Sequence, residues 1–274
     1  GDFACEQYGD ASVAFKEIND SYDVITIDYV VSHVTDSGET EYYNVEEYFR
    51  LRPTDTRMYV LNYERTMNQI FNSENSFAKD PTNIMLGIRD DSVEYKTNEA
   101  ENVVAFVQQG DLFSYNQTNN ELTKVFSFRS PEGIDIRENW NQHDIKIVSV
   151  DEAGSIDFIV YGYMNRGNHE GEVGTCVYHY DGLAHTIEEE AFIPSKSSYE
   201  VLKAEMGKLL YVNENGILYL MFEGNVYEIK LDSLKVEKIV KNLEAGCYAT
   251  SYDNQYFSWV DVDSQYSTTE LSVM

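Results

Sequence analysis

The sequence predicts an all-β protein built from a series of four-stranded antiparallel meanders. Short runs of β-forming residues, cut by turn residues, follow one another along most of the 274-residue chain. Runs of the same pattern recur about every 45 to 65 residues, close to the period of a repeated β-sheet unit. No segment carries a long apolar stripe with the helical period. Together these observations exclude a helical bundle and favour a repeat architecture.

The clearest copy of the repeat is "NENGILYLMFEGNVYEIKLDSLKVEKIV", at positions 213–240. Three β runs, 217–222, 226–231 and 235–240, are separated by a Gly-Asn turn and an Asp-Ser-Leu turn. A further run at 208–212 completes a four-stranded unit. In the middle run Glu228 and Lys230 alternate with Tyr227 and Ile229, which predicts a strand with one solvated face.

Similar copies define the expected boundaries of the repeat. An aromatic run, a polar turn and a second β run recur at 57–71, 111–128 and 176–192, and a truncated copy lies at 270–274. Other predicted strands precede each copy, among them 83–89 before the second. The first copy carries an insertion for which we predict a short helix at 45–50. The predicted repeats are 12–72, 83–128, 144–192, 208–241 and 247–274, the last of them incomplete or closed by a strand from the N-terminus.

A single meander leaves apolar side chains on both of its faces, so similar meanders stacked around an axis would cover both. We therefore predict a single β-propeller-like domain over 1–274, with about five four-stranded antiparallel blades, or a fragment of a larger propeller. The hairpins at 149–161 and 251–260 resemble those of TolB-like and WD-like blades in large bacterial cell-envelope proteins, a resemblance that implies the fold alone. A β-sandwich is the alternative.

Composition limits the setting. The chain has 48 acidic and 20 basic residues and a net charge of −28, which opposes binding to nucleic acid and to anionic membranes. No apolar run approaches the roughly 20 residues of a membrane span. The chain opens without Met and stops within a predicted strand, so we expect a segment of a larger membrane-anchored or secreted protein, outside the cytoplasm. We expect Cys5, Cys176 and Cys247 to be buried apolar residues without a disulfide framework.

The candidate binding residues lie mainly in one loop. Positions 163–175 gather polar side chains among three glycines, a composition suited to a polar ligand on a rigid scaffold. A solvated hairpin tip is the alternative. Exposed aromatic rings stack on sugars, and Trp140 lies in a predicted loop. The predicted ligand-binding residues are Asn165, Arg166, His169, Glu170, Glu172 and Trp140.

No catalytic motif is present. The sequence lacks G-x-S-x-G, HExxH and paired cysteines at zinc spacing. Strand alternation places Cys176 and His179 on opposite faces, which disfavours a dyad. We predict no cofactor and no metal site; Ca2+ at the acidic groups 89–91 or 261–263 is the alternative.

The predicted function is a non-enzymatic interaction or sensor domain, favoured as a monomer, for an unidentified protein or carbohydrate ligand. One alternative is a carbohydrate-active hydrolase that uses paired carboxylates at the propeller axis. A structural spacer is the other.

Overall fold

The computed structural model describes residues 4–75, 78–80, 83–87, 93–129, 137, 140–213, 215–244, 246–252, 256–263 and 268–273. The chain forms two compact units, Gly1–Val93 and Glu94–Met274, and each is described by itself. The predicted fold class is confirmed, because the described chain is nearly all β and consists mainly of four-stranded antiparallel sheets in succession. The single-domain organisation stays a prediction.

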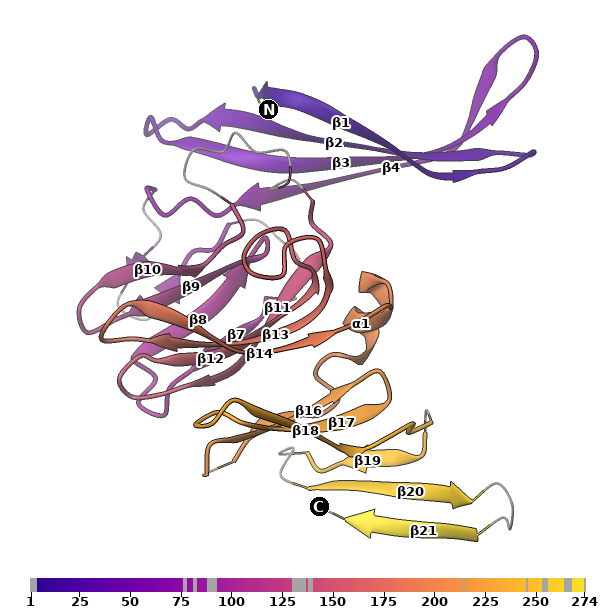
Figure 1. Cartoon of the computed structure of the whole chain (residues 1–274). Coiled ribbons are helices and arrows are strands. Elements are labelled where there is room, and N and C mark those ends of the chain that lie inside the picture. The colour runs from indigo at the N-terminus through magenta and orange to yellow at the C-terminus, as the bar shows by residue number, and fades with distance from the viewer. Residues whose placement is uncertain are drawn as a thin grey trace. The chain divides into compact units, whose positions relative to one another are not determined.

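The first unit contains a sheet of four long antiparallel strands (Figure 1). They are β1 (Glu6–Ile18), β2 (Asp23–Val34), β3 (Thr40–Pro53) and β4 (Met58–Ile70), ordered as in the sequence. A short hairpin follows, formed by β5 (Ala78–Asp80) and β6 (Asn83–Ile84). The β1–β2 turn is closed by Asn19, whose Oδ1 accepts hydrogen bonds from the backbone N–H groups of Ser21 and Tyr22 at 2.9 and 3.0 Å.

Two predictions for the first unit are wrong. The expected helix at 45–50 lies inside β3, where Tyr43 and Val45 are buried and alternate with exposed Asn44 and Glu46. The expected hairpin at 57–71 is the single strand β4, which pairs with β3 along its length. A bulge in this pairing, between Arg50 and Leu51, accommodates the register shift. Cross-strand pairing therefore extends the strand through polar residues that resemble a turn in the sequence.

The described part of the second unit contains four further sheets and one short helix (Figure 1). The first sheet has β7 (Tyr95–Thr97), β8 (Val103–Gln108), β9 (Asp111–Asn116) and β10 (Glu121–Phe126). The second has β11 (His143–Val150), β12 (Ile156–Tyr163), β13 (Val173–Asp181) and β14 (Thr186–Pro194). The third has β15 (Leu210–Val212), β16 (Ile217–Phe222), β17 (Asn225–Lys230) and β18 (Lys235–Val240). The last has β19 (Tyr248–Thr250), β20 (Phe257–Asp263) and β21 (Thr268–Val273), and α1 (Tyr199–Glu205) lies between β14 and β15.

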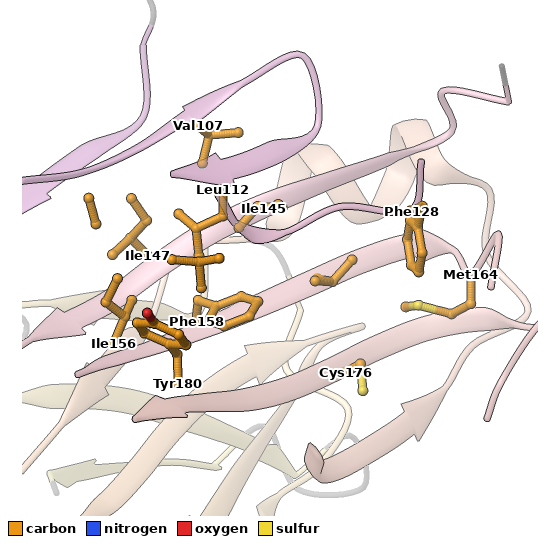
Figure 2. Packing of buried hydrophobic residues seen from close by; sticks show 13 residues of the cluster. Val107, Leu112, Phe128, Ile145, Ile147, Ile156, Phe158, Met164, Cys176 and Tyr180 are labelled. Carbon is orange, nitrogen blue, oxygen red and sulfur yellow. The ribbon is translucent and has the colours of Figure 1, made fainter. Parts of the chain in front are cut away.

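Each sheet of the second unit shares a hydrophobic core with the next. Phe158 and Val160 of β12 pack in a core with residues of β8 to β10 (Figure 2). Ile159, on the opposite face of β12, packs in a second core with residues of β16, β17 and α1. A third core joins β16 and β17 to Phe257 of β20. Because both faces of the middle sheets are buried, the meanders stack in series as blades do.

Sequence reasoning identified most strands of this unit. The meanders at 111–128, 176–192 and 213–240 are confirmed. The strand that pairs with β8 at the edge of the first sheet is β7, however, and not the predicted run at 83–89. The part of that run described as a strand is β6, which pairs with β5 in the first unit. Tyr95–Thr97 lacks an apolar pattern and is held by its pairing with β8. Glu6, considered for closure of the last blade, pairs with Ser32 in β1 and β2.

Candidate functional site

The predicted binding loop, between β12 and β13, is compact and hydrogen-bonded. The Met164 N–H donates to the Glu172 carbonyl at 2.9 Å, and the Gly171 N–H donates to the Met164 carbonyl at 2.9 Å. Asn165 is 1% exposed, and its Nδ2 donates to the carbonyls of Arg137 at 2.9 Å and Trp140 at 2.7 Å. Asn165 therefore fastens the segment around Trp140 to the loop.

The charged side chains of this loop are paired with neighbours. His169 Nε2 lies 2.8 Å from Glu189 Oε1 on β14, and its ring stacks on Phe192 at a centroid distance of 3.7 Å. The other ring nitrogen lies 3.4 Å from Glu172 Oε1. Glu170 forms an ion pair with Arg137. The contacts of His169 with Glu189 and Phe192 hold the loop against β14.

The structure brings the predicted binding residues into one neighbourhood. Arg166 lies in the same loop, and Trp140 is 55% exposed with its ring edge-to-face against Tyr163. Asn165, His169 and Glu170 each make polar contacts within the protein, so their clustering has a structural explanation. Ligand binding at these residues stays a prediction.

A cleft that sequence reasoning missed lies between the first two sheets of the second unit. Its volume is about 190 Å³. Three hairpin turns border it: β9–β10, β11–β12 and β13–β14. The lining residues are Val103, Ser114, Asn116, Asn119, Glu121, Thr123, Ala153, Gly154, Tyr180, Gly182, Leu183 and His185.

The cleft is lined mainly by neutral polar groups and one carboxylate. Tyr180 Oη lies 2.7 Å from His185 Nδ1. Burial, with the nearby Glu121 charge, raises the pKa of Tyr180, so this hydroxyl keeps its proton at neutral pH. Glu121 has no ion pair with any residue that the structure describes. Among the described residues that line the cleft there is neither Lys nor Arg. This chemistry favours neutral or cationic ligands rich in hydrogen-bonding groups.

Close contact between two turns shapes the cleft. A Cβ atom at Gly182 would lie 2.5 Å from the Gly154 carbonyl oxygen and 2.7 Å from that of Ala153. Asp181 Oδ1 accepts hydrogen bonds from the N–H groups of Leu183 and Ala184 at 2.8 and 2.9 Å, which organises the β13–β14 turn. The Asp-Gly pair at 181–182 was visible as a turn signal in the sequence. Its contact with another hairpin was not.

A second polar cluster crosses β11 to β14. Asp157 accepts a hydrogen bond from Ser149 Oγ at 2.7 Å, and its other oxygen lies 2.7 Å from His179 Nδ1. Burial lowers the pKa of His179, but the hydrogen bond and charge of Asp157 outweigh it and raise the pKa overall. Burial, together with the Asp157 charge, raises the pKa of Glu190 to about 7. None of the four residues lines the cleft.

The cysteines provide no reactive group at these sites. Cys176 is buried in the core between the first two sheets of the second unit, and burial raises its pKa to about 12. Val177, the next residue, packs in the adjacent core on the other side of the sheet. His179 shares the face of Val177 by alternation, so Cys176 and His179 lie on opposite faces as predicted. Cys5 is exposed, contrary to expectation, because it lies just before edge strand β1, and Cys247 is half-buried. All three are free.

Among the described residues no group of three or more His, Cys, Asp or Glu side chains is placed to hold a metal ion. The predicted calcium alternative at 89–91 lies outside those residues. The alternative at 261–263 belongs to β20, whose side chains there are not described. In the part of the chain that the structure describes, no helix has the length and apolar character of a membrane span.

Comparison with known proteins finds no matching family model and no matching curated protein. Solved structures with a similar arrangement include the tricorn protease, at 10% identity and a TM-score of 0.39, over 94% of this chain and 29% of that one. A Mycobacterium tuberculosis puromycin-hydrolyzing peptidase matches at 11% identity and a TM-score of 0.41, over 95% and 44% of the two chains. Porphyromonas gingivalis dipeptidyl peptidase 4 matches at 9% identity and a TM-score of 0.40, over 88% and 37%.

The chain therefore spans less than half the length of each of these three proteins. Likenesses at TM-scores below 0.5 carry no argument about activity. The architecture of the chain rests on the sheets and cores described above.

Proposed function

We propose that this chain is a non-enzymatic ligand-recognition domain that binds a small hydroxyl-rich molecule in the cleft between its β7–β10 and β11–β14 sheets. The cleft carries this proposal, because it joins a concave volume to convergent donors and acceptors. The net charge and composition favour a place outside the cytoplasm, within a membrane-anchored or secreted protein.

Size restricts the ligand. A volume of about 190 Å³ holds on the order of six waters at roughly 30 Å³ each, and it is smaller than the roughly 300 Å³ at which drug-sized pockets begin. A single sugar ring is of suitable size. Larger glycans would extend from the cleft past Leu183, whose side chain is 79% exposed.

The side chains that line the cleft restrict the ligand further. The amides of Asn116 and Asn119 and the hydroxyls of Ser114 and Thr123 suit the alternating donors and acceptors of a polyol. The Glu121 carboxylate favours a positively charged group over an anionic one. The class of ligand that satisfies both requirements is a monosaccharide that bears an amine. A neutral sugar should bind more weakly, and an acidic sugar should bind most weakly.

Isothermal titration calorimetry with D-glucosamine, D-glucose and D-glucuronate tests the proposal. An exposed ion pair contributes at most about 1 kcal/mol, so glucosamine should bind up to about fivefold more tightly than glucose. Glu121→Gln should abolish the difference in affinity between glucosamine and glucose. Glu200→Gln should leave the difference intact, because Glu200 is an exposed residue of α1 outside the cleft. The proposal fails if none of the three sugars binds, or if glucuronate binds best.

Tyr180 offers a second test that does not depend on charge. Tyr180→Phe removes the hydroxyl that contacts His185 while it keeps the ring in the core. All three sugars should bind more weakly to this variant, with their order unchanged. Unchanged affinities would exclude the Tyr180 and His185 pair from the site.

A further inference from the structure

The first sheet has one apolar and one polar face. The strand register places fourteen apolar side chains together on the surface called here the apolar face. They are Val13, Phe15, Ile18, Ile25, Ile27, Tyr29, Val31, Tyr43, Val45, Phe49, Leu51, Val60, Tyr63 and Met67. The opposite face carries mainly polar residues, among them Asp28, Glu46, Glu64 and Thr66. A sheet with this pattern normally packs its apolar face against another layer.

One end of the apolar face is open. Val31, Tyr43 and Val45 form a small buried cluster at the other end. Along edge strand β1, by contrast, Phe15 is 61% and Ile18 is 72% exposed. On the other edge strand, β4, Val60 is 59% and Tyr63 is 46% exposed. The exposed apolar residues therefore border the open end on both sides.

The open end is large enough to need a partner. About seven residues per strand at about 3.3 Å, across four strands about 4.8 Å apart, cover roughly 23 Å by 19 Å, or about 440 Å². This is as large as the largest apolar patch on a typical monomer, which is often functional. Two such patches pressed together remove roughly 800 to 1,000 Å², the size of a weak, reversible interface.

The charges of the face fit a second copy of the chain. Glu47 and Arg65 are its central charged residues; their nearest atoms lie 3.7 Å apart, and Glu47 Oε1 also accepts a hydrogen bond from Tyr63 Oη at 2.9 Å. The pair is neutral, so its burial is less costly than that of a single charge. In a two-fold arrangement, Arg65 of one copy can meet Glu47 of the other, which makes the face self-complementary.

From these observations we infer that the apolar faces of two copies pack together in a two-fold dimer. The acidic residues of the sheet lie mainly on the opposite face, so the contact does not bury them. The net charge of −28 nevertheless makes two copies repel each other at a distance. Salt screens such repulsion. The dimer is therefore weak at low ionic strength and tighter at high ionic strength. It involves the first unit and is independent of the ligand cleft in the second.

Sedimentation velocity on the whole chain, from about 1 μM to about 1 mM, tests the inference. We expect a dimer with a Kd on the order of 10 to 100 μM that tightens as salt rises from about 0.01 to about 1 M. Phe15→Asp should weaken it by about tenfold or more. Thr66→Asp adds the same charge on the opposite face and should leave the Kd within about twofold. Because Phe15 is exposed, circular dichroism should show both variants folded.

Three results would overturn the inference. The first is a monomer at every concentration and salt. The second is a dimer that Phe15→Asp and Thr66→Asp weaken equally. The third is a chain that stays monomeric but binds vesicles of phosphatidylcholine through Phe15, which would assign the face to a lipid surface.

Discussion

Replacing Gly182 by Ala tests the contact between the two turns that shape the cleft. The φ angle of Gly182 lies outside the left-handed region, so the substitution introduces no backbone strain of its own. The new Cβ would lie 2.5 Å from the Gly154 carbonyl oxygen and 2.7 Å from the Ala153 carbonyl oxygen. Unstrained contacts of carbon lie at about 3.5 to 4.0 Å. One of the two turns must therefore move by about 1 Å.

The size of the effect follows from this overlap. Forcing a methyl group into a closely packed contact costs about 1 to 3 kcal/mol. For a unit of this size, each kcal/mol lowers Tm by about 2 to 4 °C, so Gly182→Ala should melt about 2 to 12 °C lower. Both turns line the cleft, so sugar binding there should weaken in parallel whichever turn moves.

Thermal melts and urea titrations followed by circular dichroism measure this change. Leu183→Ala is the matched control, because Leu183 belongs to the same turn, is 79% exposed and should alter stability by less than about 0.5 kcal/mol. Gly167→Ala is a second control, since its Cβ meets nothing within 4 Å while its φ of +91° penalises Ala. If Gly182→Ala were as stable as the wild type, the close approach of the two turns would be refuted.

Because burial holds the pKa of Glu190 at about 7, above its ordinary 4.5, the folded chain retains a proton there that the unfolded chain releases. Urea titrations should therefore show the free energy of unfolding falling as the pH rises from 4.5 to about 7. Glu190→Gln should flatten this fall, and an identical dependence on pH in the variant would contradict the prediction. Asn165→Ala removes two hydrogen bonds that a buried side chain donates to the carbonyls of Arg137 and Trp140 and should cost about 1 to 3 kcal/mol, more than Asn168→Ala at an exposed position; equal urea midpoints would refute this role. Iodoacetamide should label Cys5 in the native protein and Cys176 only after unfolding, as mass spectrometry can show; native labelling of Cys176 would contradict its burial.

The period of the sequence determined the architecture of the second unit. Strands and their faces follow from alternation: Tyr227 and Ile229 pack in one core, and Val226, on the opposite face, packs in the next. The solvated face expected for this strand is wrong, because Val226 is buried there beside half-buried Glu228 and Lys230. Turn residues such as Gly224 mark where a strand must end. These signals are local, because a strand side chain takes its face from its neighbours along the same strand.

Local signals failed where pairing decides the structure. Residues 62–65 of β4 resemble a turn in the sequence, yet a long partner strand keeps them extended. Tyr95–Thr97 has no strand pattern and becomes a strand through its hydrogen bonds to β8. In both cases the backbone partner supplies the stability that the residues themselves do not.

By itself, the sequence determined an acidic all-β chain of stacked meanders and a polar loop after β12. Only the tertiary structure brought Glu121, Tyr180 and His185 to one cleft, joined Asp157 to His179, and gathered apolar residues from four strands on one face. The physical reason is that such sites depend on cross-strand register and on the stacking of separate sheets. Neither quantity is encoded in the spacing of residues along one strand.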